Sequence, residues 1–316
     1  MRILLVKTSS LGDVLHNLPV VTDILHHFPE AEIDWVVEEN FAELPKLHPG
    51  VQRVLTVAIR RWRRERKTAR EEIRRSVAAI REHDYDFVID TQGLLKSALV
   101  MRNAFGVRCG YSFLSAREPL ASLFYHKCFS VPKKQHAVER NRQLVAQALG
   151  YTLDTPADYG IQPPDIALKW LKASTYAVLL HATSRADKLW EEANWVELGK
   201  QLQRQGVRSV LPWGSPSELA RAQRLAAAIP AAICAPRLDL AEAATLLGGA
   251  QAVVGVDTGL AHLAAALAVP TVGIYTATDP VLTGLYAGAR AVNLGGKAQS
   301  PSVEAVMAAL GQVRRA

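Results

Sequence analysis

The segment from residue 252 to residue 275, AVVGVDTGLAHLAAALAVPTVGIY, has the pattern of a strand, an acidic turn, a helix and a second strand. Its first five residues form a short, largely β-branched apolar run that predicts a buried strand. Leucine and alanine then recur at helical spacing, so Thr258 and Gly259 are expected at a helix N-terminus, where free N–H groups and the helix dipole favour phosphate. An ordinary capped turn accounts for the same residues equally well.

Strand and helix patterns alternate along the rest of the chain, which predicts an α/β fold with parallel sheets covered by helices. The expected strands are residues 3–6, 33–37, 54–57, 87–90 and 108–111, then 176–180, 207–211, 232–234, 252–256 and 271–275. A proline-containing linker near residues 155–168 separates two Rossmann-like domains, 1–160 and 161–316, with a cleft expected between them. The last apolar pattern, 303–313, predicts a terminal helix able to pack back on the first domain.

The composition is that of a globular protein: 49% of the 316 residues are hydrophobic and 21% are charged. Charged residues or histidines interrupt each apolar run before it reaches membrane-spanning length. The N-terminus MRILLVK enters a predicted strand and lacks signal-peptide order, so we expect a cytoplasmic protein. Cys109, Cys128 and Cys234 have neither CxxC nor zinc-site spacing, which suits a reducing compartment.

Polar residues follow two further predicted strands of the second domain. In the loop HATSRADKLW, Lys188 is suited to neutralise a diphosphate, and the hydroxyls of Thr183 and Ser184 are suited to donate to the same oxygens. A solvated loop is the alternative. Glu218 is a candidate acceptor for ribose hydroxyls, although a first-turn glutamate facing the helix dipole is the simpler interpretation of that residue alone.

In the first domain, the opening strand leads into KTSSLGDV, and a helix follows. Asp13 is therefore expected at the mouth of the cleft, where its carboxylate is suited to act as general base toward a sugar hydroxyl. Ser10 and Asp13 also have the spacing of a capping box, which is the competing explanation. Lys7 is expected to orient that carboxylate or to contact acidic groups of an acceptor.

The net charge of +7 is concentrated in the run RRWRRERK, which begins at Arg60. This run suits anionic groups on an acceptor or acidic lipid headgroups, and Arg117 and His136 are further basic candidates. Nucleic acid ranks lower because no recognised binding module is present. Asp84-Tyr85-Asp86 has the D-x-D spacing of some metal-dependent glycosyltransferases, but it precedes a predicted strand and is interpreted as a turn, so no metal is expected.

Three motifs together, KTSSLGDVLHNLP, HATSRADKLW and VGVDTGLAHLAAAL, resemble lipopolysaccharide heptosyltransferase I, a group within glycosyltransferase family 9. The resemblance covers nearly the whole chain. It implies a GT-B fold and inverting transfer of L-glycero-D-manno-heptose from ADP-heptose to the first Kdo of Kdo2-lipid A. It also implies peripheral association with the inner face of the inner membrane, with no obligatory metal or other cofactor.

The resemblance assigns roles to individual residues of this chain. It makes Asp13 the catalytic base, with Lys188 stabilising the departing ADP. Its donor positions are Thr183, Ser184, Lys188, Glu218, Thr258, Gly259 and His262, with Asp257 in the same turn and Leu238 near the adenine. Ser184 stands where the family often has a second threonine and keeps the hydroxyl. The acceptor side comprises Lys7, Ser10, Arg60, Arg61, Arg63, Arg64, Arg117 and His136.

Two alternatives remain open. A related heptosyltransferase would act on a heptose acceptor, although the SSLGDV form of the first motif argues against it. A noncatalytic sugar-nucleotide-binding protein would bind ADP-heptose without forming product. The nucleic-acid binder, ranked lower above, would instead show salt-sensitive affinity for oligonucleotides and none for the sugar nucleotide.

Overall fold

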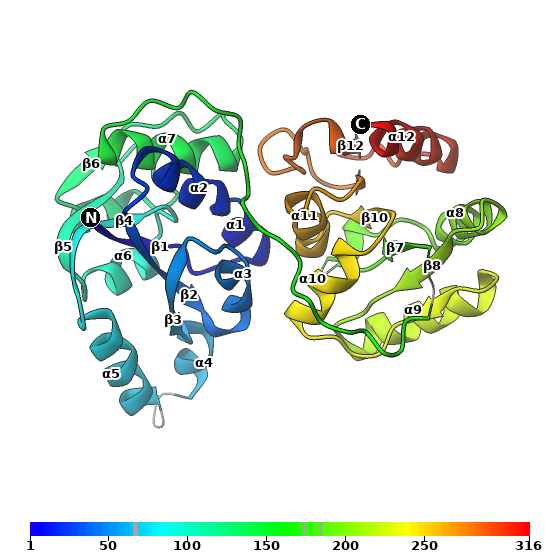
Figure 1. Ribbon diagram of the computed structural model, residues 1–316, viewed down its shortest axis with the longest axis horizontal. Helices are drawn as coiled ribbons and strands as arrows, with labels where there is room; N and C mark the ends of the chain where they lie inside the picture. Colours follow the sequence, from blue (N-terminus) through cyan, green and yellow to red (C-terminus); the bar gives the residue numbers. More distant parts are fainter. Residues whose placement is uncertain (66–68, 173–174, 184) are drawn as a thin grey trace. The chain divides into compact units, whose positions relative to one another are not determined.

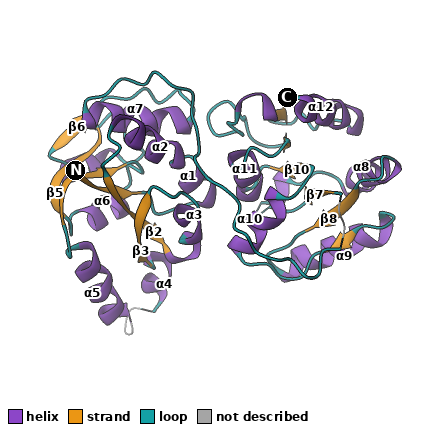
Figure 2. Ribbon diagram, viewed as in Figure 1, coloured by secondary structure: helices purple, strands orange, loops and turns teal. Residues whose placement is uncertain are grey.

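The computed structural model describes residues 1–65, 69–172, 175–183 and 185–316, which divide into two compact units, Met1–Ile161 and Gln162–Ala316 (Figure 1). The division lies beside the boundary expected from the sequence. In each unit, helices flank the strands of a parallel sheet (Figure 2). The described strands of each unit form one six-stranded sheet.

The sheet of the first unit has the strand order β3-β2-β1-β4-β5-β6. Its strands are β1 (Arg2–Val6), β2 (Glu32–Glu38), β3 (Val51–Val57), β4 (Asp84–Asp90), β5 (Phe105–Tyr111) and β6 (Lys127–Phe129). The helices are α1 (Leu11–Leu15), α2 (Leu18–His27), η1 (Glu39–Phe41), α3 (Glu43–Lys46), α4 (Ile59–Arg64), α5 (Ala69–Ile80), α6 (Leu95–Met101), η2 (Pro119–Phe124) and α7 (Ala137–Leu149).

The second unit repeats this topology with the order β12-β11-β10-β7-β8-β9. Its strands are β7 (Tyr176–Leu180), β8 (Arg208–Leu211), β9 (Ile233–Cys234), β10 (Ala252–Val256), β11 (Thr271–Tyr275) and β12 (Ala291–Gly295). The helices are η3 (Ala186–Lys188), α8 (Glu192–Arg204), α9 (Pro216–Ala228), α10 (Leu240–Gly248), α11 (Gly259–Ala266), η4 (Gly288–Arg290) and α12 (Val303–Arg315).

The central strands are apolar because helices cover both of their faces. In the first unit, Leu5 of β1 is paired with Trp35 of β2 and with Ile89 of β4, and all three side chains are fully buried. In the second unit, every residue of β7, β10 and β11 is buried. These continuous apolar runs are the pattern from which the sequence predicted parallel sheets.

The structure corrects two expectations, on the edge strands and on Asp84 and Asp86. The edge strands β6 and β12 were not predicted; both are partly exposed and lack a continuous apolar run. The expected terminal helix is α12, whose Val306, Leu310 and Val313 join the core cluster of the second unit, and its packing on the first domain stays a prediction. Asp84 and Asp86 lie in β4, not in a turn.

Alternation within β4 explains the last of these errors. Tyr85 points inward and donates to the Oδ2 atom of Asp34 at 2.7 Å. Asp86 is exposed and accepts the backbone N–H of Arg2 at 2.7 Å. A strand with one polar face therefore produced the D-x-D spacing.

Among the described residues, no helix combines the length and the apolar character needed to cross a bilayer.

Candidate functional site

The predicted functional residues follow the carboxyl ends of the central strands. In both units the first strands along the chain form one half of the sheet and the later strands form the other half. The strand order therefore reverses between β1 and β4 and between β7 and β10. Ligands of open α/β sheets bind at such points. Asp13 follows β1 in the first unit, and Asp257 follows β10 in the second.

Asp13 lies in α1 and has three polar contacts. Its Oδ2 atom accepts the backbone N–H of Ser10 at 3.0 Å and the Ser10 hydroxyl at 3.1 Å. The Nη1 atom of Arg117 lies 3.5 Å from the same oxygen. Asp13 therefore caps the helix, as the competing explanation required, and Ser10 is its partner. The cap does not exclude a catalytic role, because the carboxylate is still partly exposed.

Two cations keep the Asp13 carboxylate ionised. Burial alone would raise its pKa, but the charges of Lys7 and Arg117 and the hydrogen bonds from Ser10 outweigh that effect, so the pKa lies below its ordinary value. Asp13 is therefore ready to accept a proton at neutral pH.

Lys7 is buried at the end of β1. Its Nζ atom donates to the carbonyl of Thr91 at 2.8 Å and to Oδ1 of Asn141 at 3.3 Å. Burial lowers the pKa of this amine to about 8, although the Asp13 charge acts in the opposite direction. Lys7 is thus close enough to influence Asp13, and its own charge changes near physiological pH.

Gln92 and Lys96 complete the surroundings of this loop, and the sequence did not single them out. The Oε1 atom of Gln92 accepts the backbone N–H of Thr8 at 2.7 Å, and its Nε2 atom donates to the carbonyl of Ser9 at 2.7 Å. Lys96 donates from Nζ to the Ser9 hydroxyl at 2.6 Å. These residues come from the loop after β4 and from α6, more than 80 positions from their partners in the chain, so only folding brings them together.

The arginine side chains of the basic run on α4 project in two directions. Arg61 is half-buried and binds both oxygens of Glu39 at 3.0 Å and Glu72 at 3.1 Å. Arg60 and Arg63 are exposed, and their charges act on Lys96. Residues one position apart on a helix project about 100° apart, which explains the division. Arg61, expected on the acceptor side, is therefore held in an ion-pair network of its own.

The remaining acceptor candidates have different surroundings. Arg117 is exposed beside Asp13, whereas Arg64 is exposed at the end of α4. His136 caps α7 by accepting the N–H of Val138 at 3.2 Å, and its ring lies edge-on to that of His16. His136 thus has a structural role that the sequence analysis did not assign to it.

Lys188 and Asp257 form the central polar pair of the second unit. The Nζ atom of Lys188 lies 2.6 Å from Oδ2 of Asp257, and the hydroxyl of Thr278 donates to the same oxygen at 2.7 Å. Both charged side chains are largely, but not fully, buried. The pair fixes an ammonium group beside the N-terminus of α11. Thr278, which no sequence motif indicated, is part of this arrangement.

The turn around this pair contains most of the predicted donor residues. Thr183 donates from Oγ1 to the carbonyl of Asp257 at 3.1 Å, which ties the loop after β7 to the loop after β10. Thr258 is the N-cap of α11, but its hydroxyl makes no capping hydrogen bond, and Gly259 begins the helix. His262 lies one turn later and is buried. Ser184 lies outside the described residues.

Glu218 has a clear structural role at the start of α9. Its Oε2 atom accepts the N–H of Gly214 at 2.7 Å and of Ser215 at 3.2 Å, while Ser215 accepts the N–H of Glu218. This is a complete capping box. Leu238 is half-buried in the segment after β9, and Trp213 ties that segment to the loop after β8 through the carbonyl of Ala235. Both predicted residues thus follow strands of the same sheet.

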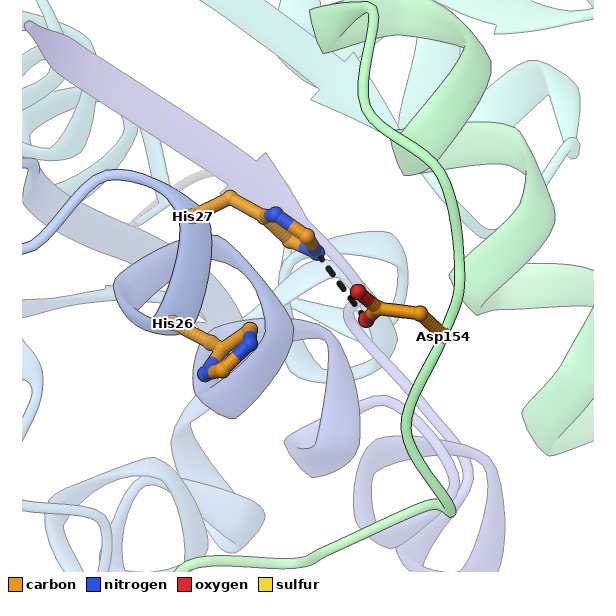
Figure 3. A group of neighbouring side chains, drawn as sticks. All are labelled: His26, His27 and Asp154. Atoms are coloured by element: carbon orange, nitrogen blue, oxygen red, sulfur yellow. Dashed lines mark ion pairs between the residues drawn. The ribbon is translucent and has the colours of Figure 1, made fainter.

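A separate polar group lies at the amino ends of the strands of the first sheet, where α2 ends before β2 begins. His26, His27 and Asp154 each offer a possible metal ligand, and these atoms all lie within 4.8 Å of one another. Figure 3 shows His27 directed at Asp154, with 3.8 Å between Nε2 and Oδ1. The His27 ring also stacks on Tyr151 at 4.4 Å. The group is remote in the fold from the Asp13 loop.

Comparisons with known proteins agree with the motifs. The model of glycosyltransferase family 9 (heptosyltransferase) matches residues 73–310. The chain is 50% identical over 295 residues to lipopolysaccharide heptosyltransferase 1 of Salmonella typhimurium, covering 90% of this chain and 92% of the relative. It is 51% identical over 299 residues to the Pseudomonas aeruginosa protein of the same name, covering 93% and 84%.

Solved structures agree as well. The E. coli heptosyltransferase WaaC with ADP matches with a TM-score of 0.92 and 44% identity, over 99% of this chain and 100% of that one. The E. coli ADP-heptose lps heptosyltransferase II matches with a TM-score of 0.79 at 22% identity, over 100% and 99%, and supports the fold alone. The expected α/β, GT-B architecture is confirmed, and the chain belongs to glycosyltransferase family 9, the heptosyltransferases.

Proposed function

We propose that this heptosyltransferase moves L-glycero-D-manno-heptose from ADP-heptose to the first Kdo of Kdo2-lipid A, with inversion at the anomeric carbon. The similarity to lipopolysaccharide heptosyltransferase 1 supports the acceptor class. The observation that carries the chemistry is Asp13, an ionised and partly exposed carboxylate held by Ser10 beside two cations.

The proposed reaction is a single displacement. A hydroxyl oxygen of Kdo attacks the anomeric carbon of the heptose, and the bond from that carbon to the ADP oxygen breaks. Asp13 takes the hydroxyl proton as the new bond forms. The electron pair of the broken bond leaves with ADP. The weak basicity of Asp13 suffices because the attacking hydroxyl becomes acidic only as it bonds to carbon.

The second unit supplies positive charge for the donor. Lys188, anchored by Asp257, and the backbone N–H groups at the start of α11 suit the two phosphates of ADP. Thr183, Ser184, Thr258, Gly259 and His262 are proposed to bind the same donor, with Glu218 at the ribose and Leu238 at the adenine. We propose that this charge replaces a metal, so a chelator should leave turnover intact.

We further propose that the enzyme works at the inner face of the inner membrane without spanning it. Exposed Arg60, Arg63 and Arg64 on α4 would attract acidic lipid headgroups. Sedimentation with anionic vesicles at low salt and release at high salt would support this. Equal binding to neutral vesicles would contradict it.

The decisive experiment is mass-spectrometric detection of product from purified protein, ADP-heptose and Kdo2-lipid A. One added heptose supports the proposal. Binding of ADP-heptose without product, while a heptose-terminated acceptor is modified, would instead support the related activity. Binding without product on either acceptor would leave a noncatalytic sugar-nucleotide-binding protein.

The buried Lys7 gives a prediction about pH. Because its pKa is about 8, Lys7 loses its charge above that pH, and kcat/KM for the anionic acceptor should fall. Lys7→Met should lower kcat/KM and flatten this alkaline fall, whereas Lys46→Met, at an exposed lysine of α3, should retain it. A rate profile of each variant from pH 6 to pH 10 measures the effect.

Unfolding would not explain that alkaline fall. The unfolded chain holds the Lys7 proton up to about pH 10.5, whereas the folded chain releases it near pH 8. The unfolded state therefore binds more protons between these values, and the contribution of Lys7 to stability rises with pH there. A melting temperature that drops in step with activity between pH 8 and pH 9 would contradict this assignment.

Because Arg61 and Arg63 project from α4 in different directions, we expect their substitutions to have different effects. Arg63→Ala should raise the KM for acceptor about tenfold, the typical effect of losing one charged hydrogen bond. Arg61→Ala should lower the melting temperature slightly, because Glu39 and Glu72 lose their partner, and should leave that KM nearly unchanged. Steady-state kinetics and thermal melts of both variants separate the roles, and the reverse pattern would refute the division.

A further inference from the structure

A largely apolar pocket of about 430 Å³ lies between α4, α5 and α6, above the end of β3. This volume is within the range of about 300 to 1,000 Å³ that ligand pockets typically have. Its apolar lining includes Val57, Ile59, Trp62, Ile73, Val77 and Leu99. Ile73 and Leu99 remain 39% and 51% exposed, so an apolar occupant would remove further apolar surface from water.

Two cations line the same pocket. Arg63 contributes from α4 and Lys96 from α6. The lining therefore favours an amphiphile, whose apolar part fills the pocket and whose anionic part meets these charges. A sugar or a phosphate alone would leave its polar groups against the apolar side chains, which is unfavourable.

Lys96 also joins this pocket to the loop of the proposed base. Its Nζ atom lies 2.6 Å from the Ser9 hydroxyl, and the next residue, Ser10, donates its N–H to Asp13. The charges of Asp13, Glu38, Arg60 and Arg63 all act on the Lys96 amine. Through Lys96 the pocket thus adjoins the loop of the proposed base, within one unit of the fold.

We propose that this pocket binds an acyl chain of the lipid acceptor, with Lys96 and Arg63 on the anionic groups near the sugar. This inference rests on the proposed function and adds to it a site for the lipid part of the substrate. Acyl recognition in the enzyme would make kcat/KM depend on the chain as well as on the sugar. Each buried methylene is worth on the order of fourfold in affinity.

The test compares two acceptors that carry the same Kdo sugars. One is fully deacylated, and the other retains its amide-linked acyl chains, below its micelle concentration. Wild-type enzyme should prefer the acylated acceptor by about tenfold or more in kcat/KM. Leu99→Glu, at a half-exposed position of the pocket, should bring this ratio close to one. Val77→Trp should do the same by filling the pocket without adding charge.

Leu123→Glu is the matched control, because Leu123 is 74% exposed in η2 and does not line the pocket. It should keep the wild-type ratio. A second measurement needs only a conservative substitution in the pocket: an acceptor with a brominated chain should quench Trp62 in the wild-type protein, and the Trp62→Phe protein should lose that part of the quenching.

The outcomes separate this inference from the proposed function. Turnover of the deacylated acceptor with a wild-type ratio near one would overturn the acyl site and leave the proposed function standing. A high ratio that both pocket variants retain, or quenching that survives Trp62→Phe, would also overturn it. Failure of the wild-type enzyme on both acceptors would overturn the proposed function and this inference together.

Discussion

Replacing Asp13 by asparagine should lower kcat by about 10²- to 10⁴-fold, the usual range for removal of a general base. Asparagine has nearly the same size and keeps an oxygen that can accept the N–H of Ser10, so α1 should retain its cap. It cannot accept the proton of the attacking hydroxyl. The loss should therefore appear in turnover and hardly in the affinity for ADP-heptose.

The control for this variant is Asp86→Asn, the same chemical change at an exposed carboxylate of β4. It should keep wild-type turnover. Single-turnover product formation measures the chemical step, while circular dichroism and ADP-heptose binding report the fold. Near-wild-type turnover of folded Asp13→Asn would show that Asp13 acts only as a helix cap, and another base would be needed.

The buried strands could be predicted almost residue by residue. Residues 176–180, 252–256 and 271–275 were expected as strands and are β7, β10 and β11. Their runs are apolar throughout because helices cover both faces of the sheet. A short, continuous apolar run is the pattern of a buried strand, so these strands could be recognised. The edge strand β6 carries an exposed lysine and cysteine, and its pattern is that of a loop. Prediction therefore succeeded where burial is complete, whereas at the sheet edges it found β3 and β9 but missed β6 and β12.

Of the candidate site, only the residues that lie within short sequence motifs could be predicted. The position of Asp13 follows from its own loop, but the two cations that hold it ionised include Arg117, 104 residues away in the chain. Likewise, a run of arginines does not reveal that Glu72 binds Arg61 while Arg63 stays exposed. Charge balance depends on tertiary contacts, and one sequence gives no direct signal of them.

Replacing Lys188 by alanine should lower kcat/KM for ADP-heptose by about 10- to 100-fold, the value of one or two charged hydrogen bonds to phosphate. Part of the loss should appear in kcat, because negative charge on the ADP grows as the glycosidic bond breaks and the ammonium stabilises that charge most in the transition state. Asp257 would keep the hydrogen bond from Thr278, so the turn should remain folded.

Two further variants distinguish the charge of Lys188 from its position. Asp257→Asn keeps the ammonium but weakens its anchor at 2.6 Å, so it should cause a smaller loss than Lys188→Ala. The double variant should be no worse than Lys188→Ala alone, since the anchor acts through the lysine. Lys169→Ala, at an exposed lysine of the same unit, is the control. Calorimetric titration with ADP should show the same order of affinities, and an unchanged kcat/KM in Lys188→Ala would remove this residue from the phosphate site.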